Sequence, residues 1–257
     1  MHPQLTPGID VALLVFWAFV AFLVALVFYL RREDRREGYP LEDVLSGRVD
    51  TPGGPLSTAS PKSFLLPFGH GVVTAPTTGR DPFDIAARRT ERFAGAPHVP
   101  TGDPLVDGIG PAAWADRAKR PDLDMEGHPR IVPLSAAPEY GIARGDSDLA
   151  GWPVIAADKA VAGTVVELWI DKADRLVRYL AVALENGGST VLAPMMMATV
   201  DRGRRRVVID AITAAQFTRA PRIDAADSIT LYEEDRVQGY FGGGYLYATA
   251  DRQEPLF

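Results

Sequence analysis

The sequence of 257 residues contains no cysteine, and this absence excludes several kinds of site at once. Without a thiol the chain can form no disulfide, no thiol nucleophile, no zinc-thiolate site and no iron-sulfur cluster of its own. Histidine is also scarce, since His2, His70, His98 and His128 are far apart and show no short metal-ligand spacing. A self-contained metal site is therefore not expected.

A long basic run is also lacking. Acidic residues outnumber basic ones, 33 against 27, which gives a formal net charge of -6, and only the stretch 202–206 concentrates arginine away from the N-terminal region. Proteins that bind nucleic acid usually carry a basic patch or stripe. Nucleic acid is therefore not an expected partner.

The familiar catalytic motifs are missing as well. The glycine-rich places at 53–54 and 242–244 lack the Lys-Ser/Thr of a phosphate loop and do not match a dinucleotide fingerprint. No Gly-x-Ser-x-Gly motif occurs, and Ser, His and Asp show no arrangement that singles out a triad. A membrane-anchored enzyme would need a nucleophile-base pair or a metal site that this sequence does not display.

What the sequence does contain is one long apolar run. Residues 11–30, VALLVFWAFVAFLVALVFYL, include no charge, glycine or proline. At ~1.5 Å per residue this run makes about 30 Å of helix, enough to cross a bilayer core. The preceding segment has no Lys or Arg, unlike the basic start of a signal peptide. The run therefore predicts a retained transmembrane helix.

A charged collar follows this helix directly. It consists of Arg31, Arg32, Glu33, Asp34, Arg35, Arg36 and Glu37 and is followed by Tyr39 in a Gly-Tyr-Pro sequence. Arginines at the end of a span favour the cytoplasmic side, so residues 1–10 are expected in the periplasm and the bulk of the chain in the cytoplasm. The mixed signs leave two interpretations open: contact with anionic lipid head groups, or contact with another protein as well.

Residues 40–155 are rich in Pro and Gly, yet apolar and aromatic residues recur throughout them. A disordered linker would contain few such residues. We therefore expect an extended, ordered segment of short strands and turns that lies across a larger surface and has too little periodicity to form a core alone.

From about Gly151 the pattern becomes that of a compact β domain. Strands are predicted at 162–170, 176–184, 189–192 and 206–209, joined by turns at 185–188 and 201–204. Short strands at this spacing suggest a small antiparallel barrel or sandwich.

A helix is expected near the C-terminus. Thr230 followed by Glu233 is a capping box that opens a helix through LYEEDRVQGY. Residues Gly242, Gly243 and Gly244 should then break this helix, or let the backbone pack closely against a partner. Local chemistry does not choose between the two.

Two groups of ionisable residues stand out. Asp171, Asp174, Arg175 and Arg178 crowd the segment between two predicted strands, while Asp122, Asp124, Glu126 and His128 alternate along DLDMEGH. Solvated turns are the simplest interpretation. The alternative is a titratable relay, because carboxylates and histidine exchange protons near neutral pH when their surroundings shift their pKa values.

Four motifs in order along nearly the whole chain resemble one known family. They are RREDRREGYPLE directly after a single span, TGDPLVDGIGPAAWADR at 101–117, LWID-x(6)-RYL at 168–180 and TLYEEDRVQGYFGGGYLYAT at 230–249. Together they resemble the H subunit of the purple-bacterial photosynthetic reaction centre, whose cytoplasmic domain gives the PRC-barrel its name.

The resemblance implies a fold and a set of partners. The fold class is an α+β membrane protein: a periplasmic N-terminus at 1–10, a transmembrane helix at 11–30, a collar and surface-covering segment at 31–150, and a mostly antiparallel PRC-barrel-like domain with a C-terminal helix at 151–257. The implied partners are the L and M subunits and membrane lipids, with an antenna complex and a cytochrome subunit as further candidates. The implied location is the bacterial inner, intracytoplasmic membrane.

The resemblance also implies a function without catalysis by this chain. A subunit of this kind binds no pigment, because bacteriochlorophyll, bacteriopheophytin, the quinones and the non-haem iron are held by the other subunits. It shields the secondary quinone site from water, so the protons needed for quinone reduction must pass through it. The remaining alternative is a single-pass PRC-barrel adapter without a photosynthetic role.

Particular residues match positions of that family. Asp174 stands where the family usually carries a Glu facing the quinone pocket, and Arg178 and Asp171 match a nearby Arg and acid. Asp124 and His128 match a proton-entry cluster in which Glu126 replaces a second His of some relatives. Arg31, Arg32, Glu33, Asp34, Arg35, Arg36 and Tyr39 fall where the family contacts the other subunits or lipid.

Overall fold

The computed structural model describes residues 8, 10–37, 41–43, 45–46, 48–50, 59–76, 84–185 and 189–253. By contacts along the chain it divides into two compact units, residues 1–83 with 91–96 and residues 84–90 with 97–257. The turn expected at 185–188 and the glycine pair at 53–54 lie largely outside the described residues.

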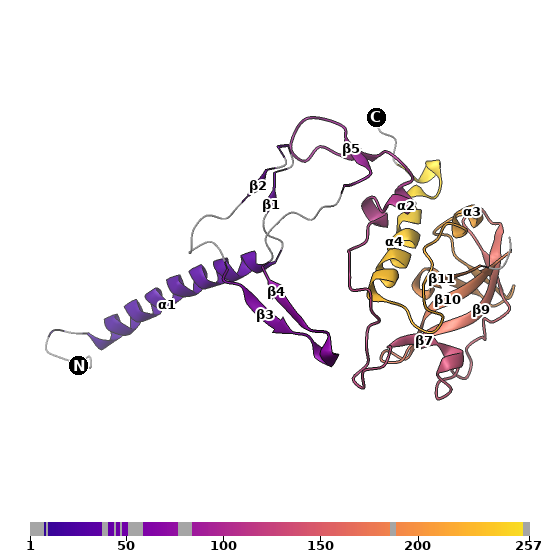
Figure 1. Ribbon diagram of the computed structural model, residues 1–257, viewed down its shortest axis with the longest axis horizontal. Helices are drawn as coiled ribbons and strands as arrows, with labels where there is room; N and C mark the ends of the chain where they lie inside the picture. Colours follow the sequence, from indigo (N-terminus) through magenta and orange to yellow (C-terminus); the bar gives the residue numbers. More distant parts are fainter. Residues whose placement is uncertain are drawn as a thin grey trace. The chain divides into compact units, whose positions relative to one another are not determined.

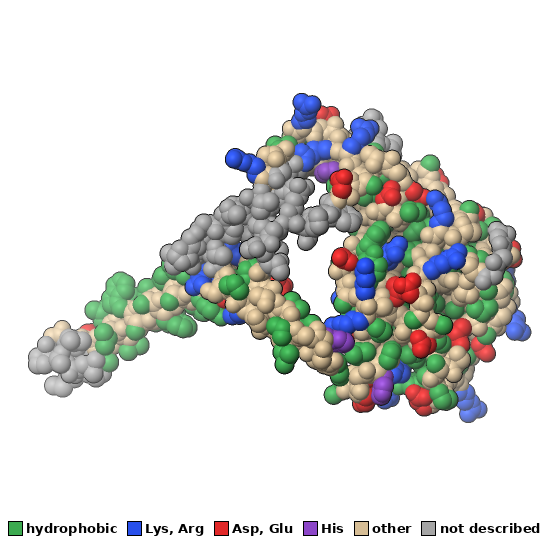
Figure 2. Space-filling view, in the orientation of Figure 1, with side chains coloured by type: hydrophobic (Ala, Val, Ile, Leu, Met, Phe, Trp, Pro, Cys, Tyr) green, Lys and Arg blue, Asp and Glu red, His purple; other side chains and the backbone are tan. Residues whose placement is uncertain are grey.

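The first unit is dominated by helix α1, Val11–Glu33. Asp10 caps it by accepting hydrogen bonds from the backbone N–H groups of Ala12 (2.8 Å) and Leu13 (3.4 Å). No side chain of α1 is buried, and its apolar side chains cover its surface in Figure 2. Its hydropathy and length allow it to cross a membrane. The helix continues three residues beyond the predicted end at 30, because Arg and Glu are good helix formers.

Two hairpins complete this unit (Figure 1). Strands β1, Leu41–Glu42, and β2, Val49–Asp50, pair antiparallel, as do β3, Lys62–Leu65, and β4, Val72–Ala75. All four residues of β3 are exposed. The described residues of this part of the segment thus include two short antiparallel strand pairs.

The second unit contains a seven-stranded sheet with the order β11-β10-β9-β8-β13-β12, to which β7 is added through β9. The strands are β7 Ile131–Pro133, β8 Pro153–Ile155, β9 Val161–Asp171, β10 Leu176–Leu184, β11 Thr190–Pro194, β12 Thr199–Asp201 and β13 Arg206–Val208. Only the pairing of β13 with β8 is parallel among the described ladders. The sheet is therefore mostly antiparallel, as predicted.

The alternation of side chains explains the core. The branched and aromatic residues of β9 and β10 form much of the core. Four of them are 0 % exposed: Val165, Tyr179, Leu180 and Val182. Side chains on successive strand residues point to opposite faces, and here both faces are covered over much of the length. Strand β10 begins and ends at the residues that the sequence predicted.

Helix α4, Leu231–Tyr247, packs beside the sheet (Figure 1). Thr230 and Glu233 form the predicted capping box. Shorter elements complete the unit: the paired strands β5, Ala87–Arg89, and β6, His98–Pro100, and the one-turn helices α2, Pro104–Asp107, and α3, Ala214–Phe217.

The expectation that three successive glycines would break this helix is wrong, because α4 runs through them. A Cβ atom on Gly243 would overlap Ala112, and one on Gly244 would overlap the backbone of Ala211. Gly243 and Gly244 therefore allow a close approach of the helix to other segments of this chain, whereas the second alternative had been close packing against a partner.

The Pro- and Gly-rich segment contributes to this core. Leu105, Ala112, Ile131 and Leu149 are 5 % exposed or less and belong to the same hydrophobic cluster as the strands. Part of the surface that the segment covers is therefore the chain's own sheet and helix.

Candidate functional site

The turn between β9 and β10 is built around Asp171. This residue ends β9, and its Oδ1 accepts hydrogen bonds from the backbone N–H groups of Ala173 (3.0 Å) and Asp174 (3.1 Å). A carboxylate that closes its own turn explains why an aspartate stands at this position. Its side chain is 0 % exposed, which requires compensation of its charge.

Arg130 supplies this compensation and joins three carboxylates. Its Nε lies 2.8 Å from Asp171 Oδ1, its Nη2 lies 2.7 Å from Asp174 Oδ2, and its Nη1 lies 3.5 Å from Asp122 Oδ2. The register of β7 on β9, which pairs Ile131 with Asp171, places Arg130 beside the turn. We call Arg130, Asp122, Asp171 and Asp174 the Arg130 cluster.

The two oxygens of Asp171 have different surroundings. Burial would raise the pKa of Asp171, but the hydrogen bonds from Arg130 and from the backbone lower it, and the net direction is below the ordinary range. Oδ1 accepts all of the hydrogen bonds, whereas Oδ2 is buried and has no hydrogen-bond partner among the described residues. The hydrogen bonds that hold this carboxylate ionised are therefore all made by one of its two oxygens.

The second acidic group forms a surface turn. The backbone N–H of Asp124 donates to the His128 carbonyl (2.9 Å), and Asp124 Oδ1 accepts from the N–H groups of Glu126 (3.2 Å) and His128 (2.8 Å). Gly127 has φ +86°, a conformation that suits glycine in such a turn. The side chains of Glu126 and His128 are exposed. The structure therefore brings all three predicted proton-entry residues together.

Lys172 connects this surface turn to the Arg130 cluster. Its Nζ lies 2.7 Å from Asp124 Oδ2, and it follows Asp171 directly in the chain. The Lys172 hydrogen bond and the backbone N–H of His128 hold the pKa of Asp124 below its usual range. Asp124 is consequently an ionised acceptor over most of the pH scale.

A polar cavity of about 240 Å³ lies next to the cluster. Its lining comprises Arg117, Asp122, Arg130, Ile131, Asp171, Arg178, Leu231, Glu234, Asp235 and Gln238. Arg178 is one of the predicted relay residues. Its Nε is buried and has no hydrogen-bond partner in the described part of the chain. A polar space of this volume can hold ordered water.

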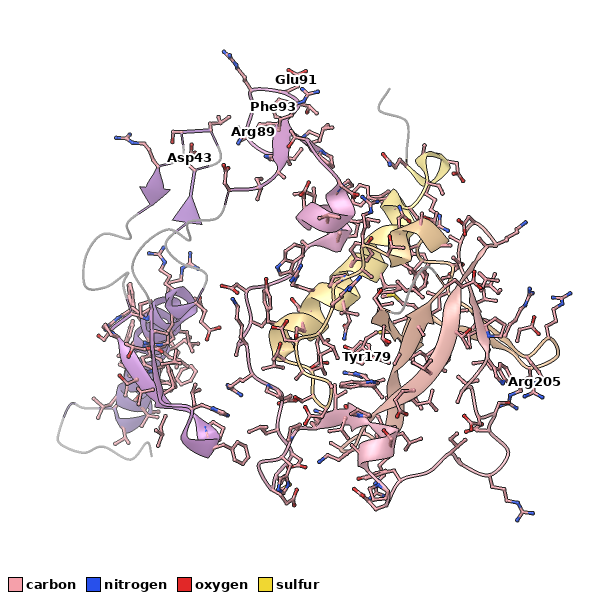
Figure 3. All side chains as sticks on the ribbon, turned by 45° about the vertical axis from the view of Figure 1, so that its right-hand side comes forward. Asp43, Arg89, Glu91, Phe93, Tyr179 and Arg205 are labelled. Atoms are coloured by element: carbon pink, nitrogen blue, oxygen red, sulfur yellow. The ribbon has the colours of Figure 1, made fainter. Side chains whose placement is uncertain are left out.

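Glu234 of α4 enters the same cavity. The fully buried Tyr179 donates its hydroxyl hydrogen to Glu234 Oε2 (3.2 Å) and accepts one from Gln238 Nε2 (2.9 Å). Figure 3 shows Tyr179 between α4 and the strands of the sheet. Burial raises the pKa of Glu234 in spite of the Tyr179 hydrogen bond. Burial also raises the pKa of Tyr179 above its ordinary value. Glu234 therefore holds a proton more readily than an exposed glutamate.

Sequence reasoning missed Arg130, Lys172, Glu234 and Tyr179. Arg130 and Asp171 are 41 positions apart, and Glu234 and Tyr179 are 55 apart, so no local pattern pairs them. One signal was present: Arg130 is a single arginine that closely follows an acid-rich stretch. A balancing cation was to be expected near so many carboxylates.

The charged collar makes contacts within its own unit. Arg36 is 9 % exposed and pairs with Glu33 (2.9 Å), while its Nη1 donates to the carbonyls of Ser60 (2.6 Å) and Ala75 (2.9 Å). Lys62 also pairs with Glu33 (2.9 Å). Part of the mixed charge therefore fixes the β3–β4 hairpin to the end of α1.

The other collar residues differ in their surroundings. Arg31 and Asp34 form an exposed pair at 3.8 Å, and Arg32 donates to the Ser60 hydroxyl (3.1 Å). Arg35 lies on the short 3-10 turn Asp34–Arg36, and Tyr39 lies outside the described residues. No group of His, Asp and Glu able to hold a metal ion occurs among the residues that the structure describes.

Comparison with protein families yields two matches. Residues 3–136 match the family described as photosynthetic reaction centre, H-chain N-terminal region. Residues 142–216 match the PRC-barrel domain. The first match covers more than half of the chain, and the second begins shortly after it ends.

Proposed function

Because the chain belongs to the photosynthetic reaction centre H-chain family, we propose that it caps the cytoplasmic face of the L and M subunits and passes protons toward the secondary quinone. Family membership makes it a non-catalytic accessory subunit of the reaction centre, without pigments of its own and anchored in the membrane by its N-terminal helix.

The proposed orientation follows from the collar. Four arginines end the apolar helix, and the residues before it carry no Lys or Arg. This asymmetry favours residues 1–10 in the periplasm, with the collar and covering segment at 31–150 and the β domain at 151–257 on the cytoplasmic side. Arg31, Asp34 and Tyr39 remain candidates for contact with lipid or with the L and M subunits, which hold the pigments, the quinones and the non-haem iron.

The observation that carries the proton role is the placement of Asp171. This buried carboxylate, whose Oδ2 has no hydrogen-bond partner among the described residues, lines a polar cavity together with Asp122, Arg178 and Glu234. Proton transfer requires groups within hydrogen-bond reach of one another or of shared water. The cavity and the Arg130 cluster supply such groups in one place.

The route begins at the surface turn. The exposed side chains of Glu126 and His128 are the entry groups of this route, and Asp124, which lies in the same turn, is the next carboxylate along it. From there the path continues past Lys172 to the Arg130 cluster and leaves through Asp174, whose side chain is 49 % exposed. Glu234, whose pKa is raised by burial, lines the same cavity and is the candidate proton store beside this path.

Replacing Asp174 with Asn tests the exit of this route. An amide cannot carry a proton at neutral pH, so we expect the proton-coupled second electron transfer to the quinone to slow by roughly tenfold. The first electron transfer should keep its rate, because it requires no proton from this chain. Flash-induced absorbance and proton uptake in isolated reaction centres measure both steps.

The matched control is Asp227→Asn, which removes an exposed carboxylate elsewhere in the same unit. It should leave both transfers unchanged. Second-transfer kinetics and proton uptake that are the same in Asp174→Asn as in the unmodified complex would overturn a rate-controlling role. A chain that co-isolates with no pigment would favour the adapter function instead.

Replacing Glu234 with Gln tests the buried carboxyl group. The folded-state pKa of Glu234 lies above its unfolded value, so ionising it opposes folding as pH rises from about 4. Gln removes this cost. The free energy of unfolding of the variant, measured relative to that of the unmodified chain, should therefore increase as pH rises toward 8. Denaturant unfolding of the full chain in mild detergent, repeated across this pH range, measures the difference.

The exposed Glu126→Gln serves as the reference for this measurement. If the Glu234→Gln difference does not change with pH, Glu234 has no raised pKa and cannot act as the proton store. The result would leave the role of Asp174 to be judged separately.

A further inference from the structure

A second cavity lies in the second unit, and no member of the Arg130 cluster lines it. Its volume is about 430 Å³, within the range typical of small-molecule sites. Aliphatic side chains form most of its lining, including Leu134, Leu149, Leu168, Ile170, Val177 and Met195. Leu149, Leu168 and Ile170 are at most 6 % exposed, so they form the walls of a pocket that continues from the hydrophobic core.

Residues 140–147 border this cavity and are held at their two ends. The Tyr140 hydroxyl donates to the Lys172 carbonyl (3.2 Å), and Asp146 pairs with Arg202 at 3.1 Å. Both partners of this ion pair are more than 60 % exposed. An exposed pair contributes little to stability, so the Asp146 end can be released at small cost.

Two arginines stand at the rim. Arg202 already binds one carboxylate, that of Asp146. Arg175 is exposed, has φ +55° in the β9–β10 turn, and its side chain makes no hydrogen bond or ion pair with the described part of the chain. An apolar pocket with cations at its entrance is complementary to a molecule with an apolar body and an acidic end.

We propose that this cavity binds a single apolar chain with an acidic head group, such as a fatty acid or a lysophospholipid. The apolar chain occupies the space among Leu149, Leu168 and Ile170. The acidic group takes the place of the Asp146 carboxylate on Arg202 and pairs with Arg175. The residues of this site are distinct from those of the proton route, because no member of the Arg130 cluster lines the cavity.

The test uses the full chain in nanodiscs of neutral phosphatidylcholine. A fatty acid that carries a photoreactive diazirine is added, and in parallel the fatty alcohol of the same length. After illumination, mass spectrometry locates the labelled peptides. We expect the acid to label residues 140–149, 168–177 and 195–202 about tenfold more than the alcohol does, because only the acid pairs with the arginines.

Matched variants separate the cations from the ion pair. Arg175→Gln with Arg202→Gln should lower this labelling about tenfold. Asp146→Asn breaks the same ion pair but keeps Arg202, so labelling should stay or rise. Arg204→Gln removes a neighbouring exposed arginine that does not line the cavity and should have no effect.

Four labelling results would overturn the proposal: equal labelling by acid and alcohol, labelling only on the membrane helix, no loss in the double arginine variant, or an equal loss in Asp146→Asn. Competition then identifies the source of the head group. If oleate suppresses the labelling at a lower concentration than lysophosphatidylglycerol does, the ligand is a free fatty acid. If lysophosphatidylglycerol suppresses it at the lower concentration, the ligand is a lipid. Displacement by neither would contradict the site.

Discussion

Replacing Arg130 with Gln is expected to lower the free energy of unfolding by about 3 kcal/mol, the range found when one partner of a buried ion pair is removed. Arg130 is 27 % exposed, whereas Asp171 beneath it is fully buried. The variant leaves Asp171 with only its two backbone hydrogen bonds as compensation for a buried charge. Denaturant unfolding of the full chain, followed by the fluorescence of the buried Trp152 and Trp169, measures the loss.

The pH dependence of this loss has a definite sign. The folded-state pKa of Asp171 lies below its unfolded value, so its contribution to stability is present above about pH 4 and is lost as pH falls through the folded value. The gap between the variant and the unmodified chain should therefore be widest near neutral pH and close in acid.

A double-mutant cycle identifies the cause. Asp171→Asn in the Arg130→Gln background removes the unpaired charge and should recover part of the loss. Arg204→Gln, which removes an arginine that is 72 % exposed, should cost at most about 0.5 kcal/mol. A cost for Arg130→Gln equal to this control, or one that does not vary with pH, would contradict the assignment.

Replacing Gly244 with Ala is expected to destabilise the second unit by about 2 kcal/mol, even though Ala is the better helix former. The new Cβ would overlap the Ala211 carbonyl oxygen and lie 2.8 Å from the Ala211 carbonyl carbon. These are backbone atoms and cannot turn aside as a side chain can. The helix must therefore move away from the segment that contains Ala211.

Gly242 provides the matched control in the same helix. A Cβ there would meet its nearest atoms at 3.7 Å and 3.8 Å, which are ordinary contact distances. Gly242→Ala should be neutral or stabilising by up to about 1 kcal/mol through helix propensity. The test compares the unfolding midpoints of Gly244→Ala and Gly242→Ala. Equal midpoints would show that no close approach exists at Gly244.

The candidate site was only partly predictable from sequence. Asp124, Glu126 and His128 lie within five residues and form one turn, so local chemistry could group them. Asp171 and Asp174 were also grouped by a turn. The cation that joins Asp171 and Asp174 was not predictable, because Arg130 reaches them through the pairing of β7 with β9.

The fold shows the same division. Composition and periodicity alone determined the membrane helix, the strand at 176–184 and the capping box at Thr230, because each depends on neighbours within one turn or one strand. Only the tertiary structure decided that α4 runs through its glycines, since the contacts with Ala112 and Ala211 come from distant parts of the chain. Likewise, the buried position of Asp171 and the raised pKa of Glu234 depend on burial, a property of the assembled core that no short stretch of sequence carries.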